Sequence, residues 1–224
     1  IGAAVTYRDA LPGLCELYPE MRPLLLRLGA EQVRNAGTIG GNIANGSPIG
    51  DMPPPLIALG ATLVLASRTG RREMPLEDYF IDYGRQDLRP GECVESVRIP
   101  APGDGLRFAV YKVSKRFDQD ISALCGAFAV RLDGGTVTQA RICFGGMAGT
   151  PRRAPRAEQA LTGQPWAEGT VAAAMRALAD DYTPLTDWRA SADYRRRAAQ
   201  NLLRRFFLEC EAGAPVQVAA GAVP

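Results

Sequence analysis

A glycine-rich polar segment at residues 34–51 carries the residue types best suited to binding a phosphate-containing ligand. The adjacent Gly40 and Gly41 allow the backbone to approach a ligand closely and to direct successive N–H groups into one concavity, as in phosphate-binding nests. The segment also supplies neutral hydrogen-bonding side chains and one carboxylate, from Thr38, Asn42, Asn45, Ser47 and Asp51. These groups suit a pyrophosphate, a sugar or a ribityl chain, although a glycine-rich turn that binds nothing has a similar composition.

The residue types of the whole chain exclude several other kinds of site. The glycine spacing is not the dinucleotide-binding GxGxxG, and no Gly-Lys-Ser/Thr follows as in a Walker loop. The chain has no histidine, which excludes Ser-His-Asp triads, histidine bases and histidine-ligated zinc or haem. Its five cysteines contain no CxxC spacing, so we expect no metal site on this chain.

Cysteine usage, charge and hydropathy indicate the cellular setting. Five scattered cysteines do not resemble a disulfide framework, and free thiols are typical of a reducing cytoplasm. The net charge of +2, from 26 basic and 24 acidic residues, argues against nucleic-acid partners and a polybasic membrane anchor. The longest apolar stretch, at 53–66, is interrupted by prolines and glycines and is too short to span a bilayer. We interpret the arginines of the last helix as a solvated face or a subunit contact.

The apolar pattern predicts the elements that must position the glycine-rich segment, and it indicates an α+β fold. In the first half we expect a strand at 1–6, two short helices within 9–28, a loop at 34–51, a helix at 53–59, and strands at 61–67 and 93–99. In the second half we expect strands at 107–114, 123–132 and 137–144, followed by helices at about 154–162, 168–182 and 191–210.

A Pro- and Gly-rich segment at 100–105 predicts a domain boundary. We therefore expect one domain at 1–103, a second at 104–212 and a flexible tail at 213–224. The second domain would be a small antiparallel sheet with a three-helix layer.

The run QVRNAGTIGGNIANGSPIGD at residues 32–51 resembles the FAD-binding segment of the xanthine dehydrogenase family of molybdenum hydroxylases. Segments at 89–94, 111–122 and 143–153 resemble further parts of the same flavoproteins, and the similarity covers about residues 1–210. The resemblance implies that 1–103 is the second half of a vanillyl-alcohol-oxidase-type FAD-binding domain. It implies that 104–212 is a C-terminal domain of the CO dehydrogenase flavoprotein type, and that the first half of the FAD domain lies upstream.

The resemblance assigns nine residues to FAD binding: Leu28, Thr38, Gly40, Gly41, Asn42, Ser47, Asp51, Val94 and Lys112. Leu28 stands where many relatives carry an aromatic residue, so only apolar contact with FAD would remain. Lys112 would place a positive charge near the flavin and favour its anionic reduced form. Ordinary roles stay open beside these, with Leu28 and Val94 as core residues, Asp51 as a helix N-cap and Lys112 as a solvated strand lysine.

Four other residues match family positions near the nicotinamide entrance: Tyr83, Asp118, Asp120 and Ile121. Tyr83 could stack on the nicotinamide nucleotide, and the loop charges would influence whether NAD enters. Gln119 stands where some relatives have a carboxylate. A partly buried tyrosine and a solvated charge cluster are the ordinary alternatives.

The resemblance implies a place for the chain in an electron-transfer enzyme. Electrons from purine hydroxylation at molybdenum would pass through 2Fe–2S clusters to FAD, and hydride would then pass to NAD. The clusters and the molybdopterin would be held by partner segments or subunits, and this chain would be the flavin portion of a bacterial-type xanthine dehydrogenase. The alternatives are the FAD subunit of an aldehyde oxidase or CO dehydrogenase, a non-redox assembly module, and a phosphate-binding regulator without redox chemistry.

Overall fold

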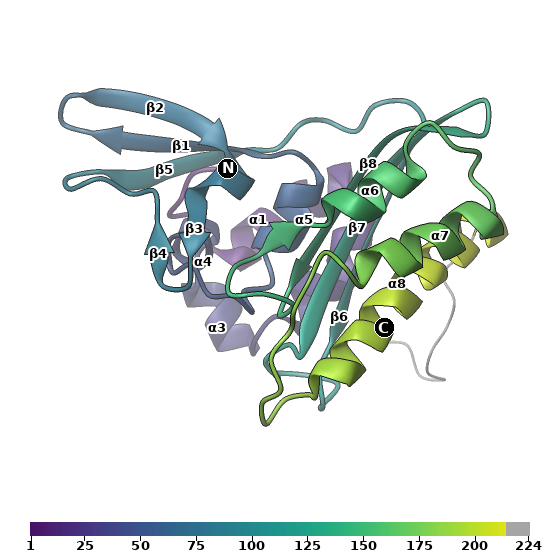
Figure 1. The fold of residues 1–224 in the computed structure, drawn as a ribbon. Coiled ribbons are helices and arrows are strands. Elements are labelled where there is room, and N and C mark those ends of the chain that lie inside the picture. The colour runs from purple at the N-terminus through teal and green to yellow at the C-terminus, as the bar shows by residue number, and fades with distance from the viewer. Residues whose placement is uncertain (214–224) are drawn as a thin grey trace.

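The computed structural model describes residues 1–213, which form a helical layer and three antiparallel sheets, of three, two and four strands (Figure 1). Short helices open the chain: α1 (Tyr7–Leu17), η1 (Pro19–Met21), α2 (Arg22–Arg27), α3 (Glu31–Ala36), α4 (Ile39–Ala44) and α5 (Pro53–Ala58). A three-stranded sheet follows in the order β2 (Gly70–Pro75), β1 (Thr62–Ser67), β5 (Cys93–Arg98). The short helix η2 (Leu76–Tyr79) and the pair β3 (Phe80–Asp82) and β4 (Arg85–Gln86) lie between β2 and β5 in the chain.

The second half is an antiparallel sheet with helices on one face. Its strands are in the order β6 (Leu106–Val113), β7 (Leu124–Asp133), β8 (Thr136–Gly145) and β9 (Arg152–Arg153). Three helices follow, α6 (Pro155–Leu161), α7 (Glu168–Leu178) and α8 (Ala192–Ala212), and Figure 1 shows them over the face that is turned away from α5. The expected small sheet with a three-helix layer is therefore present, as is the expected mixture of helices and antiparallel strands.

Alternate residues of β6 face two different hydrophobic cores. Phe108 and Val110 belong to the core shared with the first half, whereas Ala109 and Tyr111 belong to the core under α6–α8. This follows from the two-residue period of a strand, in which neighbouring side chains point to opposite faces. The sheet therefore joins the two halves through one continuous apolar layer, and Lys112 falls on the side of the first half.

Helix α5 packs against this sheet at β7 and β8. All six of its residues are buried, and its three prolines occupy the first turn, where a missing N–H breaks no helical hydrogen bond. An apolar helix of this kind needs burial on every side. Its position brings the end of the glycine-rich segment, at Asp51, against the β6–β8 sheet.

Four expectations need correction or fall outside the described residues. Residues 1–6 form no strand, only isolated bridges from Gly2 to Ser96 and from Thr6 to Thr38. The first of the two helices expected within 9–28 begins earlier, at Tyr7, and continues through Pro12 to Leu17. The segment 34–51 is not all loop, because it contains the end of α3 and the whole of α4. The tail expected at 213–224 lies outside the described residues from 214 onward.

No helix among residues 1–213 is long and apolar enough to cross a membrane.

Candidate functional site

The first turn of α4 is built from the Thr-Ile-Gly-Gly run. Thr38 caps the helix, with its Oγ1 accepting a hydrogen bond from the Gly41 N–H at 3.0 Å. The Ile39 and Gly40 N–H groups donate to the carbonyls of Val5 and Ala3, both at 3.0 Å. These three N–H groups are therefore used within the chain, and they do not form the open nest that the adjacent glycines suggest. What the turn offers a ligand is its outer backbone surface and its side chains.

The two glycines of this turn have different roles. Gly40 is buried, and a Cβ there would lie 2.3 Å from the Ala3 Cβ, so glycine is needed for close packing. Gly41 is exposed, and a Cβ there would meet only the Thr38 Oγ1, at 2.8 Å, within 4 Å. Gly41 thus leaves the surface of the turn open, and any larger residue would fill that space and disturb the cap.

Asn42 and Ser47 shape the turn that leads to Asp51. Asn42 Oδ1 accepts a hydrogen bond from the Met52 N–H at 3.3 Å, and Ser47 Oγ accepts one from the Ile49 N–H at 3.4 Å. Burial raises the pKa of Tyr7 to about 12, against the opposing effect of its hydrogen bond with Asn42. The amide of Asn42 therefore links Tyr7 of α1 to Met52, the residue that follows Asp51.

Asp51 and Lys112 form a buried ion pair together with Ser122. Lys112 Nζ lies 2.6 Å from Asp51 Oδ2 and 2.7 Å from Ser122 Oγ, and the Ser122 hydroxyl donates to the other carboxylate oxygen. All three residues are less than 9% exposed. Breaking one partner of a buried pair leaves an uncompensated charge, which costs about 3–5 kcal/mol.

This geometry excludes two of the alternative roles that the sequence left open. Lys112 is not a solvated strand lysine, and its charge is balanced by a carboxylate rather than standing alone. Asp51 is not the N-cap of α5, because that position is Met52 and no side chain caps the helix. The Asp51 backbone carbonyl also lies 3.9 Å from the Cys125 Sγ, and burial raises the pKa of that thiol well above its usual value, with the Asp51 charge adding to the effect.

Arg27 connects the first half to the loop at 114–122. Its guanidinium donates to the Phe117 carbonyl at 2.8 Å, to the Lys112 carbonyl at 2.9 Å and to Ser114 Oγ at 3.1 Å. It also stacks on the Phe117 ring, 4.9 Å from the ring centroid. Sequence reasoning missed Arg27, which belongs to no motif and is indicated only by its position beside Leu28. Ser122 ends the segment at 111–122 that resembles the family, but the sequence assigned it no role.

The two apolar residues expected at FAD lie against the first core. Leu28 is 7% exposed at the end of α2, and Val94 is half-buried in β5 opposite Leu65. Both residues therefore serve as core residues, and their contact with FAD stays a prediction.

The residues expected near the nicotinamide entrance lie in two places. Tyr83 is 73% exposed in the turn between β3 and β4, beside Gly149. Asp120 lies in the loop at 114–122 and accepts hydrogen bonds from the Arg116 N–H at 2.9 Å and its guanidinium at 3.1 Å. These bonds lower the pKa of Asp120, and its carboxylate therefore joins the two ends of the loop through Arg116. Asp118 accepts from the Gln119 N–H at 3.0 Å.

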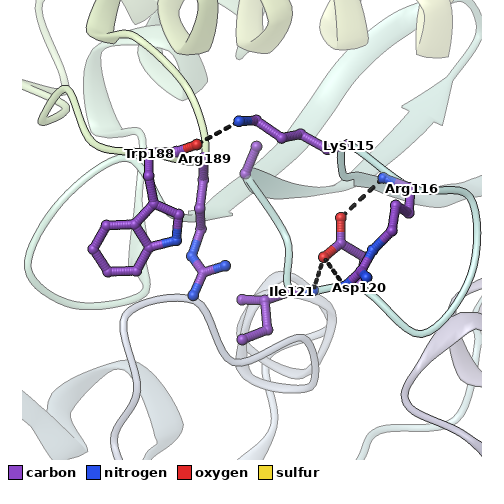
Figure 2. A pocket seen from close by; sticks show the side chains of 7 residues that line it. Lys115, Arg116, Asp120, Ile121, Trp188 and Arg189 are labelled. Carbon is purple, nitrogen blue, oxygen red and sulfur yellow. Dashed lines mark hydrogen bonds and ion pairs between the residues drawn. The ribbon is translucent and has the colours of Figure 1, made fainter.

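A pocket of about 330 Å³ opens beside this loop (Figure 2). It is lined by Lys115, Arg116, Asp120, Ile121, Ala123, Trp188 and Arg189. Two of the four residues expected near the nicotinamide entrance, Asp120 and Ile121, therefore lie in one hollow, and Tyr83 is not among the residues that line it.

The residues of the glycine-rich segment fit FAD in character. An open backbone surface at Gly41, neutral polar side chains beside it and a buried ion pair at its far end suit a phosphate-bearing group joined to a polar ring. The side chains next to Gly41 are neutral, and the one carboxylate of the segment, Asp51, is paired with Lys112. Thr38, Asn42 and Ser47 would hold the cofactor through hydrogen bonds.

Comparison with known proteins assigns both halves of the chain to one family. Residues 1–102 match the FAD binding domain in molybdopterin dehydrogenase, and residues 109–210 match the CO dehydrogenase flavoprotein C-terminal domain. The chain is 33% identical to the glyceraldehyde dehydrogenase medium chain of Sulfolobus acidocaldarius, over 93% of its own length and 74% of the relative's. It is 30% identical to the xanthine dehydrogenase FAD-binding subunit of Escherichia coli O157:H7, over 96% and 74%.

A solved structure shows the same fold. Carbon monoxide dehydrogenase from Hydrogenophaga pseudoflava superposes with a TM-score of 0.88 at 32% identity, covering 96% of this chain and 75% of that one. The resemblance read from the glycine-rich segment is thereby confirmed. The chain belongs to the molybdenum hydroxylase family, among its FAD-binding flavoprotein chains.

Proposed function

We propose that the chain is the flavin portion of a xanthine dehydrogenase whose electron acceptor is NAD. FAD, when bound, would supply the chemistry that links one-electron transfer from iron–sulfur clusters to two-electron transfer to an acceptor. The 2Fe–2S clusters and the molybdenum cofactor would be held by partner subunits of the same enzyme. The chain's own residues would bind FAD, orient it and set the charge around it.

The single observation that carries the FAD assignment is the open surface of Gly41 beside the capping Thr38. Gly41 is exposed, and a Cβ there would meet only the capping Thr38 Oγ1 within 4 Å, so the absence of a side chain keeps the cap undisturbed and leaves the outer surface of the turn open. Thr38 and Asn42 stand on either side with hydrogen-bonding groups. The position matches the family's FAD-binding segment, and it gives a cofactor room to lie directly on the backbone.

The ion pair at the end of the same segment would set the electrostatics of the site. Lys112 and Asp51 are held rigidly by Ser122, so their charges need not reorganise when the flavin changes its own charge. A cation turned to the flavin would stabilise the reduced anion, and the carboxylate would moderate that effect. We place the Lys112 role in electrostatics rather than in proton transfer.

Support for NAD comes from the loop at 114–122 and from Tyr83. Arg27 and the Arg116–Asp120 pair hold this loop in a defined conformation. Tyr83 presents an exposed ring that could stack on a nicotinamide nucleotide. Support for xanthine comes from the Escherichia coli relative, which is named for that substrate.

A second candidate, the FAD subunit of an aldehyde-oxidising enzyme or of a CO dehydrogenase, is favoured by the other relatives. The glyceraldehyde dehydrogenase medium chain is 33% identical over 93% of this chain, which is no weaker than the xanthine dehydrogenase match. A cytoplasmic setting is part of the proposal, because all five cysteines are free thiols, as expected in a reducing compartment.

The test begins with the natural complex purified without added cofactor. Its visible absorption spectrum and chromatography of the released chromophore give the FAD content, for which we expect about one FAD per copy of this chain. Reduction of NAD and of an artificial dye is then measured with xanthine, with aldehydes and with CO. Xanthine-dependent NAD reduction supports the proposal, whereas dye reduction by an aldehyde or CO alone supports the second candidate. A folded complex without FAD would overturn both and leave an assembly module or a regulator.

A further inference from the structure

Three large apolar side chains lie around a hollow between the loop at 114–122 and the region where α8 begins. Ile121, Trp188 and Tyr194 line this hollow and are 49%, 77% and 51% exposed. Phe117 and Leu185, which are 58% and 77% exposed, come from the same two regions of the chain. Solitary exposed apolar residues are common, but several large ones around one hollow mark an interaction site.

The hollow has two connected parts. The pocket of about 330 Å³ has the Trp188 ring and Ile121 on its walls, as Figure 2 shows. A second pocket of about 220 Å³ includes Tyr194 and shares Lys115, Ala123 and Arg189 with the first. Each part thus has one aromatic residue on its wall, and the basic residues Lys115 and Arg189 line both parts.

These two cations are left without an acidic partner in the part of the chain that the structure describes. The Arg189 guanidinium lies over the Trp188 ring, 5.1 Å from its centroid, and pairs with no carboxylate in residues 1–213. Lys115 Nζ donates to the Trp188 backbone carbonyl, which carries no full charge. Arg116 differs, because Asp120 neutralises it. The hollow therefore has apolar walls and unbalanced positive charge.

The scaffold behind the hollow is rigid. The Arg195 side chain is 3% exposed, donates to the Ala123 carbonyl at 3.0 Å and to the Leu185 carbonyl, and pairs with the Asp187 carboxylate at 2.9 Å. It thereby fixes the segment that presents Trp188 against the start of β7. A segment whose backbone is already fixed loses little backbone entropy on binding.

We propose that this surface, named here the Trp188 surface, is the docking site for another subunit of the same enzyme, whose contacting face carries an apolar pocket bordered by carboxylates. The inference rests on the proposed function in taking the chain to work within a multi-subunit enzyme. It departs from that function at one point, because it assigns the hollow beside Asp120 and Ile121 to the partner subunit and leaves NAD access to Tyr83. Trp, Tyr and Arg are the residues that most often dominate protein–protein binding energy, and here all three line one hollow. The partner's carboxylates would pair with Arg189 and Lys115, and its pocket would enclose the Trp188 indole.

The test is hydroxyl-radical footprinting of the purified natural complex, read by peptide mass spectrometry. Tyr83 is the internal reference, because it is 73% exposed, close to the 77% of Trp188. We expect Trp188 to be labelled at least fivefold more slowly, relative to Tyr83, than its exposure and intrinsic reactivity require. Labelling of Trp188 at the full rate in the complex would overturn the proposal. Protection that arises only when NAD or another nucleotide is added would also overturn it, since the occupant would then be a small ligand.

Variants of the complex give a second, independent measurement. We expect Trp188→Ala and Arg189→Glu each to raise the dissociation constant of the assembly at least tenfold, measured by mass photometry on dilution. The matched control is Arg68→Glu, an equal charge reversal at an exposed arginine in the β1–β2 turn. Equal dissociation of all three complexes would contradict the proposal. FAD content is measured on the same samples, so that a parent complex without FAD defeats the proposed function and leaves the Trp188 surface intact.

Discussion

Lys112 and Asp51 lie 61 positions apart in the chain, yet the Lys112 ammonium stands 2.6 Å from an Asp51 carboxylate oxygen in a site closed to solvent. The carboxylate belongs to the half that matches the FAD binding domain, and the ammonium belongs to the half that matches the flavoprotein C-terminal domain. Each half therefore holds a charge that only the other half can neutralise. The two halves are coupled electrostatically as well as through their shared core.

A double-mutant cycle tests this coupling. We expect Lys112→Met alone to lower the free energy of unfolding by about 3–5 kcal/mol, because it leaves a buried carboxylate without a partner. Asp51→Asn alone leaves a buried ammonium and should have a similar cost. The double variant should lose clearly less free energy of unfolding than the sum of the two single losses, as expected for residues in direct contact. Hydrogen exchange of α5 and β6 amides in the natural complex measures these energies, and strictly additive costs would contradict the coupling.

Ser122→Ala separates the hydroxyl from the ion pair. The Ser122 hydroxyl donates to Asp51 and accepts from Lys112, so its removal leaves one carboxylate oxygen and one ammonium hydrogen without a partner. We expect a loss of about 1–3 kcal/mol by the same exchange measurement. Ser67→Ala, at the end of β1 where the hydroxyl hydrogen-bonds to Thr69 and Gly70 of the β1–β2 hairpin, is the control and should change the exchange of α5 and β6 little. Equal effects at both serines would show that Ser122 does not stabilise the pair.

The strands of the second half could be predicted closely from the sequence. The expected strands at 107–114, 123–132 and 137–144 differ from β6, β7 and β8 by one residue at each end. The reason is local, because apolar alternation is strong here and Asp133-Gly134-Gly135 can only be a tight turn.

The first half was harder to predict because its elements depend on distant contacts. Helix α4 was missed, since two glycines and two asparagines in residues 39–45 favour a loop. It forms because Thr38 caps it and because Ile39 and Ile43, both 0% exposed, anchor one face in the core. The apolar run at 1–6 was interpreted as a strand, but only isolated bridges at Ser96 and Thr38 pair with it. The pattern of neighbouring residues does not show which distant residues a segment will pair with.

The candidate site shows the same limit. Asp51 and Lys112 were named from the sequence, but their pairing was not, because nothing in the spacing indicates a contact across 61 positions. Arg27 was missed although it makes three hydrogen bonds to residues 112–117. An arginine beside a helix end is common on surfaces, and only the tertiary structure shows that this one fixes the loop.

Gly41→Val tests whether the cofactor lies on the backbone of α4. A branched side chain would fill the open surface of the turn, so we expect the FAD content of the purified complex to fall at least tenfold. Gly169→Val is the matched control, because Gly169 is also an exposed helix glycine with nothing within 4 Å of its Cβ position. Thr38→Val separates the effects further, since it removes the cap, at a cost of about 1 kcal/mol, without filling the surface. FAD retained in Gly41→Val would show that the turn does not carry the cofactor.

Cysteine labelling checks the burial of the sheet between the two cores. Burial raises the pKa of Cys125 and Cys143 well above the usual value, and it raises that of Cys210 to about 12. A raised thiol pKa means less reactive thiolate at any given pH below it. At pH 8 we expect a maleimide to modify the exposed Cys93 first and to leave Cys125 and Cys143 intact until the chain unfolds.

The pH dependence of labelling follows from the same shifts. Labelling of Cys210 should rise about tenfold per pH unit between pH 8 and 10, because the thiolate fraction grows in that proportion below a pKa of about 12. Peptide mass spectrometry of the natural complex measures each site separately. Early modification of Cys143 under native conditions would contradict the packing of β8 between the two cores.

The charge balance of the ion pair predicts opposite changes in the flavin reduction potential. Lys112→Met leaves the Asp51 carboxylate unbalanced, and negative charge disfavours the reduced anion, so the potential should fall. Asp51→Asn leaves the Lys112 ammonium unbalanced, so the potential should rise. The reduction potential of one variant should lie below that of the parent and the potential of the other above it, as expected where a buried charge acts over a short distance in a low-dielectric site.

Spectroelectrochemical titration of the FAD-loaded complex measures these potentials. Arg68→Glu is the control for a change of net charge far from the pair, and it should leave the potential unchanged. Shifts of the same sign in both variants would indicate a structural disturbance rather than electrostatics. Potentials that do not move in either variant would place the ion pair too far from the flavin to act on it, and would leave Lys112 and Asp51 with the single task of joining the two halves of the chain.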